Sequence, residues 1–364
     1  MKVTRLSATH YRNLKELEIY PQEGVNIIYG ENAQGKTNLL ESIWMFTGCR
    51  SFRGAKDAEL ISLQNEAARL EMDFYAEGRD QEATLLLDEK RHAVLNGIQL
   101  PSASKLMGEF RAVVFSPVHL SLVKEGPAQR RRFLDLALSQ LRPRYASLLS
   151  QYNRALAQRN ILLKDIAYHS ELMDTLAIWD ERLAMLGAQI IYQRRSYVDR
   201  MQESAVAFYH GLSRGREELS LAYASSIEGR SAEEIAYELS EKLTKNRAED
   251  LKNGSTSVGP HRDDLEIYVD QLSARIYGSQ GQQRSCALSM KLSEAALIRE
   301  ITGEQPVALL DDVMSELDAG RQDYILNHIE GWQVFITCCE PSSLLRLCDG
   351  KTFSLRSGCL EETA

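Results

Sequence analysis

The sequence predicts an α/β fold in which both ends of the chain build one compact head and a mainly helical arm is inserted between them. A glycine-rich loop, Gly30 to Thr37, lies near the start of the chain, and the carboxylate pair Asp311-Asp312 that best completes it lies far downstream. Between these motifs, apolar residues recur at spacings of three and four, as in amphipathic helices. The two motifs belong in one site, so the two ends of the chain must fold together.

The glycine-rich loop has the sequence of a phosphate-binding loop, or Walker A motif. Gly30 and Gly35 let the backbone curl so that successive N–H groups point at phosphate oxygens. A short apolar strand at 24–29 leads into the loop, and a helix at 38–45 leaves it with its N-terminus towards the anion. Lys36 should reach the β- and γ-phosphates, and the hydroxyl of Thr37 should bind Mg²⁺. The predicted ATP-binding residues are Gly30, Glu31, Asn32, Ala33, Gln34, Gly35, Lys36 and Thr37.

Composition indicates a soluble globular protein. A chain of 364 residues with 44% hydrophobic and 26% charged residues has room for two or three domains. No apolar run approaches the roughly 18 residues that would cross a bilayer, and residues 1–5 lead into no signal-peptide core. The six cysteines, Cys348 among them, include no Cys-x-x-Cys pair, so neither a zinc site nor a disulfide framework is indicated. We expect a cytoplasmic protein without a membrane partner.

The charge of the chain is unevenly distributed. Although the formal net charge is −8, residues 126–216 hold fourteen Lys or Arg against eight Asp or Glu, which leaves −14 for the rest. Most of these basic residues are arginines, which pair with phosphate in a bidentate way. We therefore select Arg130, Arg131 and Arg132 as candidate DNA contacts. The alternative is a solvated helix face with internal ion pairs.

The remaining elements follow from local patterns. The first 125 residues are rich in short alternating or β-branched segments, and the texture becomes helical after Pro127, where two long helices would form an antiparallel arm. Predicted strands are 3–7, 17–20, 70–76, 83–88, 112–115, 219–224, 265–269, 307–310 and 334–337, and predicted helices after the arm are 231–251, 281–301 and 319–329. This order places the head in 1–125 and 251–364, and the helical arm with its return segment in 126–250.

The strand at 307–310 ends in the paired carboxylates, the arrangement of a Walker B motif. Asp311 can hold Mg²⁺, and Asp312 can orient or deprotonate the attacking water as the catalytic base. The alternative is a strand that merely ends in a turn aspartate. With Lys36 and the phosphate loop in the same chain, the paired acids favour catalysis.

A second motif, Ser279-Gln280-Gly281-Gln282-Gln283, opens the helix that precedes this strand. A serine hydroxyl and free N–H groups at a helix N-terminus suit an anion, although the same pattern also serves as an ordinary helix cap. The order of motifs is that of ABC-type ATPases, in which this helix closes on the nucleotide of a second subunit. The residues predicted to act in trans are Ser279, Gly281, Gln282 and Gln283, with Ser315 and Asp318 in the D-loop.

Six segments together resemble the RecF family, bacterial recombination-mediator ATPases of the SMC/ABC superfamily. They are Tyr11 to Leu14, Gly30 to Thr37, Pro127 to Asp135, Gly259 to Asp264, Gly278 to Arg284 and Leu310 to Asp318. The chain departs from the family where an acidic residue is expected in a Phe-x-Pro-x-Asp-Leu segment, since Val118-His119 stands there.

The resemblance implies an SMC-like head, called Lobe I, and an inserted arm, called Lobe II. It implies that ATP joins two heads into a dimer that clamps single- and double-stranded DNA at gaps, with weak DNA-stimulated hydrolysis driving release. The implied partners are RecR, with RecO and RecA in the same pathway, and the implied processes are gap repair, replication restart and the SOS response. A cytoplasmic, nucleoid-associated location follows.

Other functions stay open on the sequence. Another SMC-like repair ATPase and a non-hydrolysing ATP-switched scaffold are alternatives. A helicase is compatible with the charge, but the Ser-x-Gly-Gln element favours a clamp over a translocating motor. A GTPase is disfavoured because it needs an Asn/Thr-Lys-x-Asp base-reading motif, and Thr244-Lys245-Asn246-Arg247 lacks the aspartate.

Overall fold

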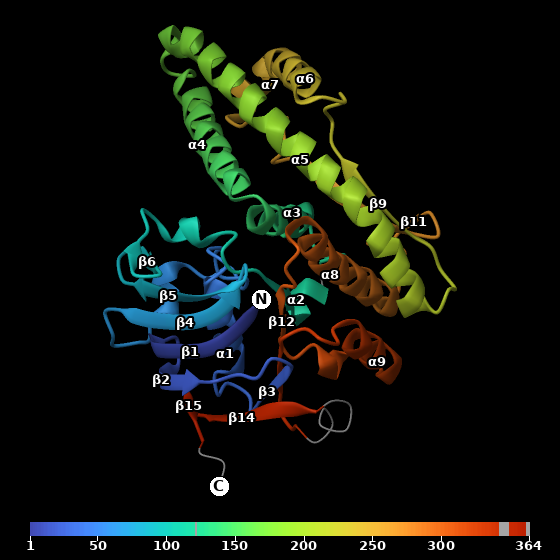
Figure 1. Cartoon of the computed structure of the whole chain (residues 1–364). Helices are drawn as coiled ribbons and strands as arrows, with labels where there is room; N and C mark the ends of the chain where they lie inside the picture. Colours follow the sequence, from blue (N-terminus) through green and yellow to red (C-terminus); the bar gives the residue numbers. More distant parts are fainter. Residues whose placement is uncertain (121, 342–348, 362–364) are drawn as a thin grey trace. The chain divides into compact units, whose positions relative to one another are not determined.

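A computed structural model describes residues 1–120, 122–341 and 349–361 of the chain (Figure 1). The chain falls into two compact units. Unit 1 comprises residues 1–121, 207–217 and 283–364, and unit 2 comprises residues 122–206 and 218–282. Residues 251–282, which the sequence grouped with the head, therefore group with unit 2. No helix in the described ranges is long and apolar enough to cross a membrane.

The first sheet of unit 1 is antiparallel, with strand order β2-β1-β4-β5-β6-β7. Its central strands alternate buried and exposed side chains, which is typical of a sheet with one face on a core. The strands are β1 (Lys2–Tyr11), β2 (Leu14–Ile19), β4 (Ala68–Ala76), β5 (Arg79–Leu87), β6 (Arg91–Leu95) and β7 (Ile98–Gln99).

The second sheet of unit 1 has the order β15-β14-β3-β13-β12-β8, and all its strands except β15 pair in parallel. Strands from the start of the chain thus pair directly with strands from its end, as the sequence predicts. The strands are β3 (Val25–Tyr29), β8 (Ala112–Phe115), β12 (Val307–Leu310), β13 (Val334–Cys338), β14 (Gly350–Arg356) and β15 (Cys359–Leu360).

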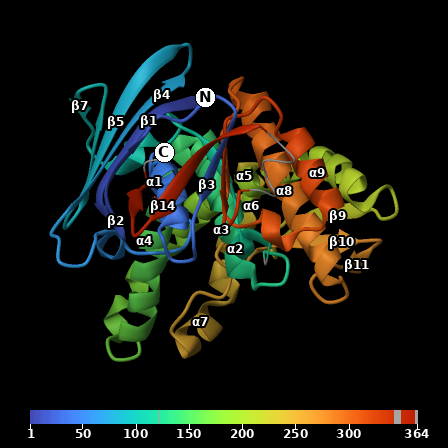
Figure 2. The ribbon, with the colours of Figure 1, turned by 90° about the horizontal axis from the view of Figure 1, so that it is seen from below.

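Helix α1 (Lys36–Met45) lies between the two sheets, since it contacts β1 of the first and β13 of the second (Figure 2). Its side chains Leu39, Ile43 and Trp44 are buried. Unit 1 also contains α2 (Pro117–Leu120), α9 (Ala319–His328), most of α8 (Gln280–Thr302), and the 3₁₀ helices η1 (Asp57–Leu60), η2 (Ala103–Leu106) and η4 (Met314–Glu316).

The register of the parallel sheet brings the candidate motifs to one edge. Cys338 at the end of β13 pairs with Tyr29 at the end of β3, and Ile336 pairs with Leu310 at the end of β12. The carboxyl ends of parallel strands lie at the same edge of a sheet. Strands β3 and β12 are the two neighbours of β13, so the residues that follow them lie close together at this edge. The phosphate loop and Asp311 are therefore neighbours.

Unit 2 is built mainly from helices. The sequence predicted two long arm helices, and the structure has three, because Pro143 lacks the N–H that would continue the first helix and instead opens the next. The helices are α3 (Pro127–Leu141), α4 (Pro143–Asp165), α5 (Met173–Ser213, ending in unit 1), α6 (Ala232–Lys245) and α7 (Arg247–Asn253), with η3 (Ser170–Leu172). A small antiparallel sheet orders β9 (Leu219–Ala224), β10 (Asp264–Val269) and β11 (Leu272–Ser273) as β11-β10-β9.

Helices α4 and α5 lie side by side and run in opposite directions (Figure 1). Arg194, midway along α5, bonds the hydroxyl of Tyr145 near the start of α4, whereas Asp180, near the start of α5, pairs with Arg159 towards the end of α4. The predicted antiparallel arrangement is present within unit 2.

Candidate nucleotide-binding site

The phosphate loop of unit 1 has the backbone that its glycines permit. Gly35 has φ 111° and ends the loop as the N-cap of α1, and Ala33 adds a second left-handed turn with φ 64°. A Cβ on Gly30 would lie 2.3 Å from the carbonyl oxygen of Leu355, and one on Gly35 would lie 2.7 Å from Oδ1 of Asn13. These two positions require glycine. The N-terminal amides of α1, capped by a residue without a side chain, suit a phosphate.

Lys36 lies with its ammonium group curled over the loop. Its Nζ donates to the carbonyl oxygens of Gly30 at 2.6 Å and Glu31 at 2.8 Å. An ammonium group held on backbone carbonyls can turn to a phosphate oxygen when one is present, because Lys donors are on a flexible stem. This position agrees with the predicted phosphate-binding role.

The other loop side chains contact protein. Gln34 accepts from the amide of Ser357 at 2.5 Å, and Oδ1 of Asn32 accepts from the thiol of Cys339 at 3.3 Å. Asn32 and Gln34 therefore shape the loop, and the phosphate contacts left to this segment are its amides, Lys36 and Thr37.

Thr37 and Asp311 meet although they are 274 positions apart. The Thr37 hydroxyl donates to Oδ1 of Asp311 at 2.7 Å, and the Thr337 hydroxyl lies 3.1 Å from the same oxygen. Burial raises the pKa of Asp311, and the hydrogen bonds from Thr37 and Thr337 oppose that rise. Asp312 is exposed, so it can contact water. The pair thus separates into a buried acid on the loop and an accessible acid beside it.

The oxygens of this site fit Mg²⁺. Mg²⁺ prefers hard oxygen ligands and is usually held by one or two carboxylates together with phosphates and water. Thr37 and Asp311 supply a hydroxyl and a carboxylate that already touch. Among the described residues, no cluster of three or more His, Cys, Asp or Glu forms a self-sufficient metal cage. These residues would hold Mg²⁺ only together with phosphate oxygens, as a nucleotide site requires.

Two residues of the site were missed by sequence reasoning. Asn13 donates to the carbonyl oxygen of Ala33 at 3.0 Å and accepts from Asn38 at 2.7 Å, so it braces the phosphate loop. Thr337 contacts both members of the acid pair. The only signals were that Asn13 lies in one of the segments that resemble the RecF family and that Thr337 ends the predicted strand 334–337.

The Ser279 motif forms a reciprocal cap at the start of α8. The Ser279 hydroxyl accepts from the amide of Gln282 at 3.2 Å, and Oε1 of Gln282 accepts from the amide of Ser279 at 2.7 Å. Ser279 is exposed. Ser279 and Gln282 therefore form the ordinary helix cap that was the alternative interpretation. The same cap holds the exposed hydroxyl of Ser279 at the N-terminus of α8. Its role towards a second subunit remains a prediction, as it does for Gly281 and Gln283.

The D-loop residues lie directly after the acid pair. The Ser315 hydroxyl is 2.9 Å from the carbonyl oxygen and 3.0 Å from Oδ1 of Asp312. Asp318 is the N-cap of α9 and accepts from the amide of Arg321 at 3.1 Å. Ser315 thus contacts the predicted base directly, whereas Asp318 starts the following helix.

The arginine run in unit 2 differs from its prediction. Arg130 is 3% exposed and makes a bidentate pair with Asp264, with both distances 2.7 Å. Its third nitrogen donates to backbone carbonyls, including that of Glu125 at 2.6 Å. Arg131 donates to the carbonyl oxygen of Asp263 at 2.7 Å, and Arg132 is half-buried. A buried, paired guanidinium is not available to a DNA phosphate, so the position of Arg130 gives no support to the predicted DNA contact.

The segment Gly259 to Asp264, whose role the sequence left open, is also internal to unit 2. Its carbonyl at Pro260 accepts from Arg194 at 2.7 Å, and Asp263 accepts from the hydroxyl of Tyr223 at 2.7 Å. Burial lowers the pKa of His261 to about 4, so this imidazole is neutral at neutral pH and bonds the hydroxyl of Tyr152. The segment braces unit 2.

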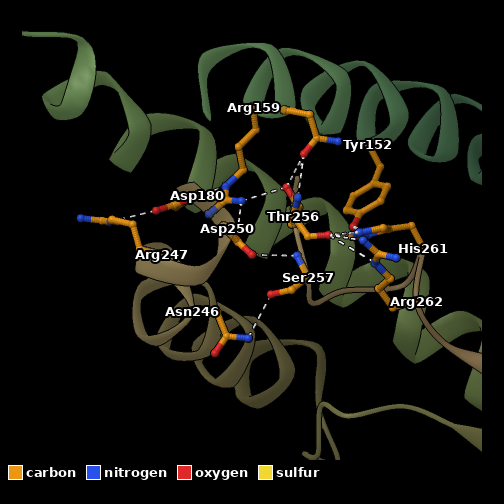
Figure 3. Close-up of polar contacts among 11 residues, drawn as sticks. Tyr152, Arg159, Asp180, Asn246, Arg247, Asp250, Thr256, Ser257, His261 and Arg262 are labelled. Carbon is orange, nitrogen blue, oxygen red and sulfur yellow. Dashed lines mark hydrogen bonds and ion pairs between the residues drawn. The ribbon is translucent and has the colours of Figure 1, made fainter. Parts of the chain in front are cut away.

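A buried ion network lies next to this segment (Figure 3). Arg159, fully buried, donates to Asp180 at 2.6 Å and to Asp250 at 2.7 Å, which ties α4 to α5 and α7. The carbonyl oxygen of Thr256 accepts from both His261 and Arg262. Many of the arm's arginines are thus structural ties.

The parallel sheet, the phosphate loop and the acid pair define a P-loop nucleotide-binding protein with an inserted helical unit. A family model described as the RecF/RecN/SMC N terminal domain matches residues 2–349. The DNA replication and repair protein RecF of Lachnoclostridium phytofermentans is 41% identical over 340 residues, which cover 93% of this chain and 92% of that protein. The chain belongs to the RecF family.

Solved structures agree with this membership. A structure of the recombination mediator protein RecF-ATPrS in the RecFOR pathway matches with a TM-score of 0.93 at 39% identity, covering 100% of this chain and 98% of that one. The Smc head domain of Pyrococcus furiosus, 14% identical with a TM-score of 0.54 over 99% and 95% of the two chains, shares the fold. The predicted α/β head of the SMC type is confirmed.

Proposed function

We propose that this chain is an ATP-controlled DNA clamp that acts in recombinational repair and replication restart. The observation that carries the proposal is the hydrogen bond of 2.7 Å between Thr37 and Asp311, because it completes a nucleotide site from the two ends of the chain. The relatives' names, which concern DNA replication and repair, supply the biological setting.

In the proposed reaction, the amides of the phosphate loop and Lys36 bind the phosphates of ATP. Thr37 and Asp311 would hold Mg²⁺, which supplies positive charge to the phosphate oxygens. Asp312, exposed beside them, orients the attacking water and accepts its proton. Hydrolysis is weak, is stimulated by DNA and releases the clamp.

The clamp closes through a second copy of the chain. Ser279, Gly281, Gln282 and Gln283 of one subunit approach the ATP bound by the other, with Ser315 and Asp318 at the same interface. The support is that Ser279 is exposed and that its cap holds the hydroxyl at a helix N-terminus, where a negative charge is favoured.

The DNA-contacting surface is better assigned to α4 than to the arginine run. Helix α4 contains no acidic residue before its last, Asp165, and its side chains Arg144 and Arg154 are exposed. Exposed arginines on an acid-free helix attract phosphate without a competing carboxylate. Arg142, which directly precedes the helix, is also exposed. Arg131 and Arg132, which are half-buried, are kept as secondary candidates for DNA contact, and the buried Arg130 is left out.

The proposed substrate is gapped DNA, with single- and double-stranded parts, and the proposed partners are RecR, RecO and RecA. Support comes from the similar structure, which belongs to a protein of the RecFOR pathway. The clamp would mark gaps for RecA loading and so support the SOS response. It would act in the cytoplasm at the nucleoid.

Two substitutions test the proposal by separating ATP binding from dimerisation. We expect Lys36→Arg to abolish ATP-driven dimerisation. We expect Ser279→Arg to abolish dimerisation as well, while its ATP affinity stays within about twofold of wild type, because Ser279 acts on the ATP of the other subunit. Mass photometry over a range of ATP concentrations and fluorescent-ATP titration measure the two properties. Ser170→Arg, another exposed serine, is the matched control and should dimerise normally. A Ser279→Arg chain that dimerises with ATP would refute the trans role.

A further inference from the structure

Thr337 is a buried hydroxyl between the two candidate acids. It is 1% exposed and lies near the end of β13, after the apolar residues Val334 to Ile336. The strand register pairs Ile336 with Leu310, so Thr337 stands one position further, level with Asp311. A valine would suit a buried parallel strand equally well, so the strand itself does not require the hydroxyl.

The two hydrogen bonds of this hydroxyl have a defined direction. The amide of Asp312 donates to Oγ1 of Thr337 at 2.8 Å, which uses the oxygen as an acceptor. The single hydroxyl proton can then be donated to Oδ1 of Asp311, 3.1 Å away. The Thr337 hydroxyl therefore connects the carboxylate expected to face Mg²⁺ with the backbone of the predicted base.

The backbone of Asp312 needs such support. Asp312 has φ 50°, in the left-handed region that non-glycine residues seldom adopt. The bond from its amide to Thr337 and the contact of its carbonyl oxygen with the Ser315 hydroxyl, at 2.9 Å, hold the residue from two sides. Backbone strain held by surrounding contacts is common where a side chain must be aimed.

We propose that Thr337 is a positioning residue for ATP hydrolysis, holding Asp312 and Asp311 in the mutual orientation that the reaction uses. The proposal rests on the proposed function, because it needs Asp312 to act on water. Thr337 itself touches neither the nucleotide nor the water in this assignment. Its effect passes through the amide of Asp312 and the carboxylate of Asp311.

The test compares Thr337→Val, which removes the hydroxyl at nearly constant shape, with Thr337→Ser, which keeps it. For Thr337→Val we expect kcat for ATP hydrolysis to fall about tenfold, the effect of one hydrogen bond, with KM changed less than about twofold. In the nucleotide-free protein, amide hydrogen exchange at Asp312 should accelerate about tenfold. Thr337→Ser should restore both properties, and Thr337→Ala replaces the valine variant if that variant yields too little folded protein.

Thr47 provides a matched control. Its buried hydroxyl also accepts from one amide, that of Cys49 at 3.3 Å, and donates to one oxygen, that of Trp44 at 2.8 Å. Thr47→Val should leave kcat and the exchange of Asp312 unchanged. Wild-type exchange or wild-type kcat in Thr337→Val would overturn the proposal, as would a Thr337→Ser variant that behaves like valine. If Asp312→Asn leaves hydrolysis intact, the proposed base fails instead, and the exchange result still decides whether Thr337 holds Asp312.

Discussion

The phosphate loop and the arginine run are the two most conspicuous features of the sequence, and the structure treats them differently. The loop has the left-handed glycine conformations that its sequence predicts, with Lys36 bonded to the Gly30 carbonyl and Thr37 to Asp311. In the run, Arg130 is buried against Asp264, and Arg131 is bonded to the backbone. A motif defined by spacing and glycine positions predicted geometry, whereas a local excess of charge did not predict exposure.

The difference has a physical cause. The curl of the loop is set locally by Gly30 and Gly35, whose conformations other residues resist. The environment of Arg130 depends on Asp264, which is 134 positions away and carries no local signal of pairing. Asp264 lies outside residues 126–216, so the charge balance of that segment does not include the partner of Arg130.

The largest effect expected from this comparison is a loss of stability. Arg130→Ala leaves Asp264 without its partner and should lower the free energy of unfolding by about 3 kcal/mol. Arg144→Ala, at an exposed arginine of α4, should change it by no more than about 0.5 kcal/mol. Urea unfolding measures both.

The same pair of variants separates the two roles in DNA binding. Arg144→Ala should reduce the slope of log affinity against log salt by about 0.7 to 0.9, the value of one phosphate contact. Arg130→Ala should keep the wild-type salt slope when DNA binding is measured without urea, at a temperature where the variant is folded. If Arg130→Ala is as stable as wild type and also lowers the salt slope, then Arg130 contacts DNA and is not a structural residue.

A smaller effect is expected at the acid pair. Asp312→Asn keeps the shape of the residue but removes the proton acceptor, so kcat should fall about a hundredfold, equivalent to about 2.7 kcal/mol, while ATP still binds. Single-turnover hydrolysis and nucleotide titration measure the two properties. Asp323→Asn, in α9, is the control and should hydrolyse ATP normally. Unchanged hydrolysis in Asp312→Asn would show that Asp312 is not the base, whereas a wild-type chain that binds ATP without hydrolysing it would favour the non-hydrolysing scaffold.

Much of the fold was predictable because its signals are local. The predicted bounds of β8, β9 and β12 agree with the structure, since each is a short apolar or alternating segment between turn signals. Strand β14 was missed because Gly350 to Arg356 is half polar, and its place is set by pairing with β3. The break between α3 and α4 does have a local signal, because Pro143 cannot continue a helix.

The sequence predicted the motif residues of the site but not the residues that support them. Walker A, Walker B and Ser279 were found by their spacing, and the meeting of Thr37 with Asp311 agrees with that reading. Asn13 and Thr337 could not be found in the same way, because each acts through side-chain hydrogen bonds to residues that are distant in the sequence. The contacts of Thr337 depend on the pairing of β13 with β12, and those of Asn13 depend on the packing of the turn between β1 and β2 against the phosphate loop.

In the proposed function, ATP bound in the head controls the affinity of the chain for DNA. The most direct test is the affinity for gapped DNA, measured by fluorescence anisotropy at fixed salt with and without ATP, together with the mass of the complex. We predict that ATP tightens binding at least tenfold and that the DNA-bound species contains two copies of the chain. Equal affinity with and without ATP, or a DNA-bound monomer at saturating ATP, would contradict the account.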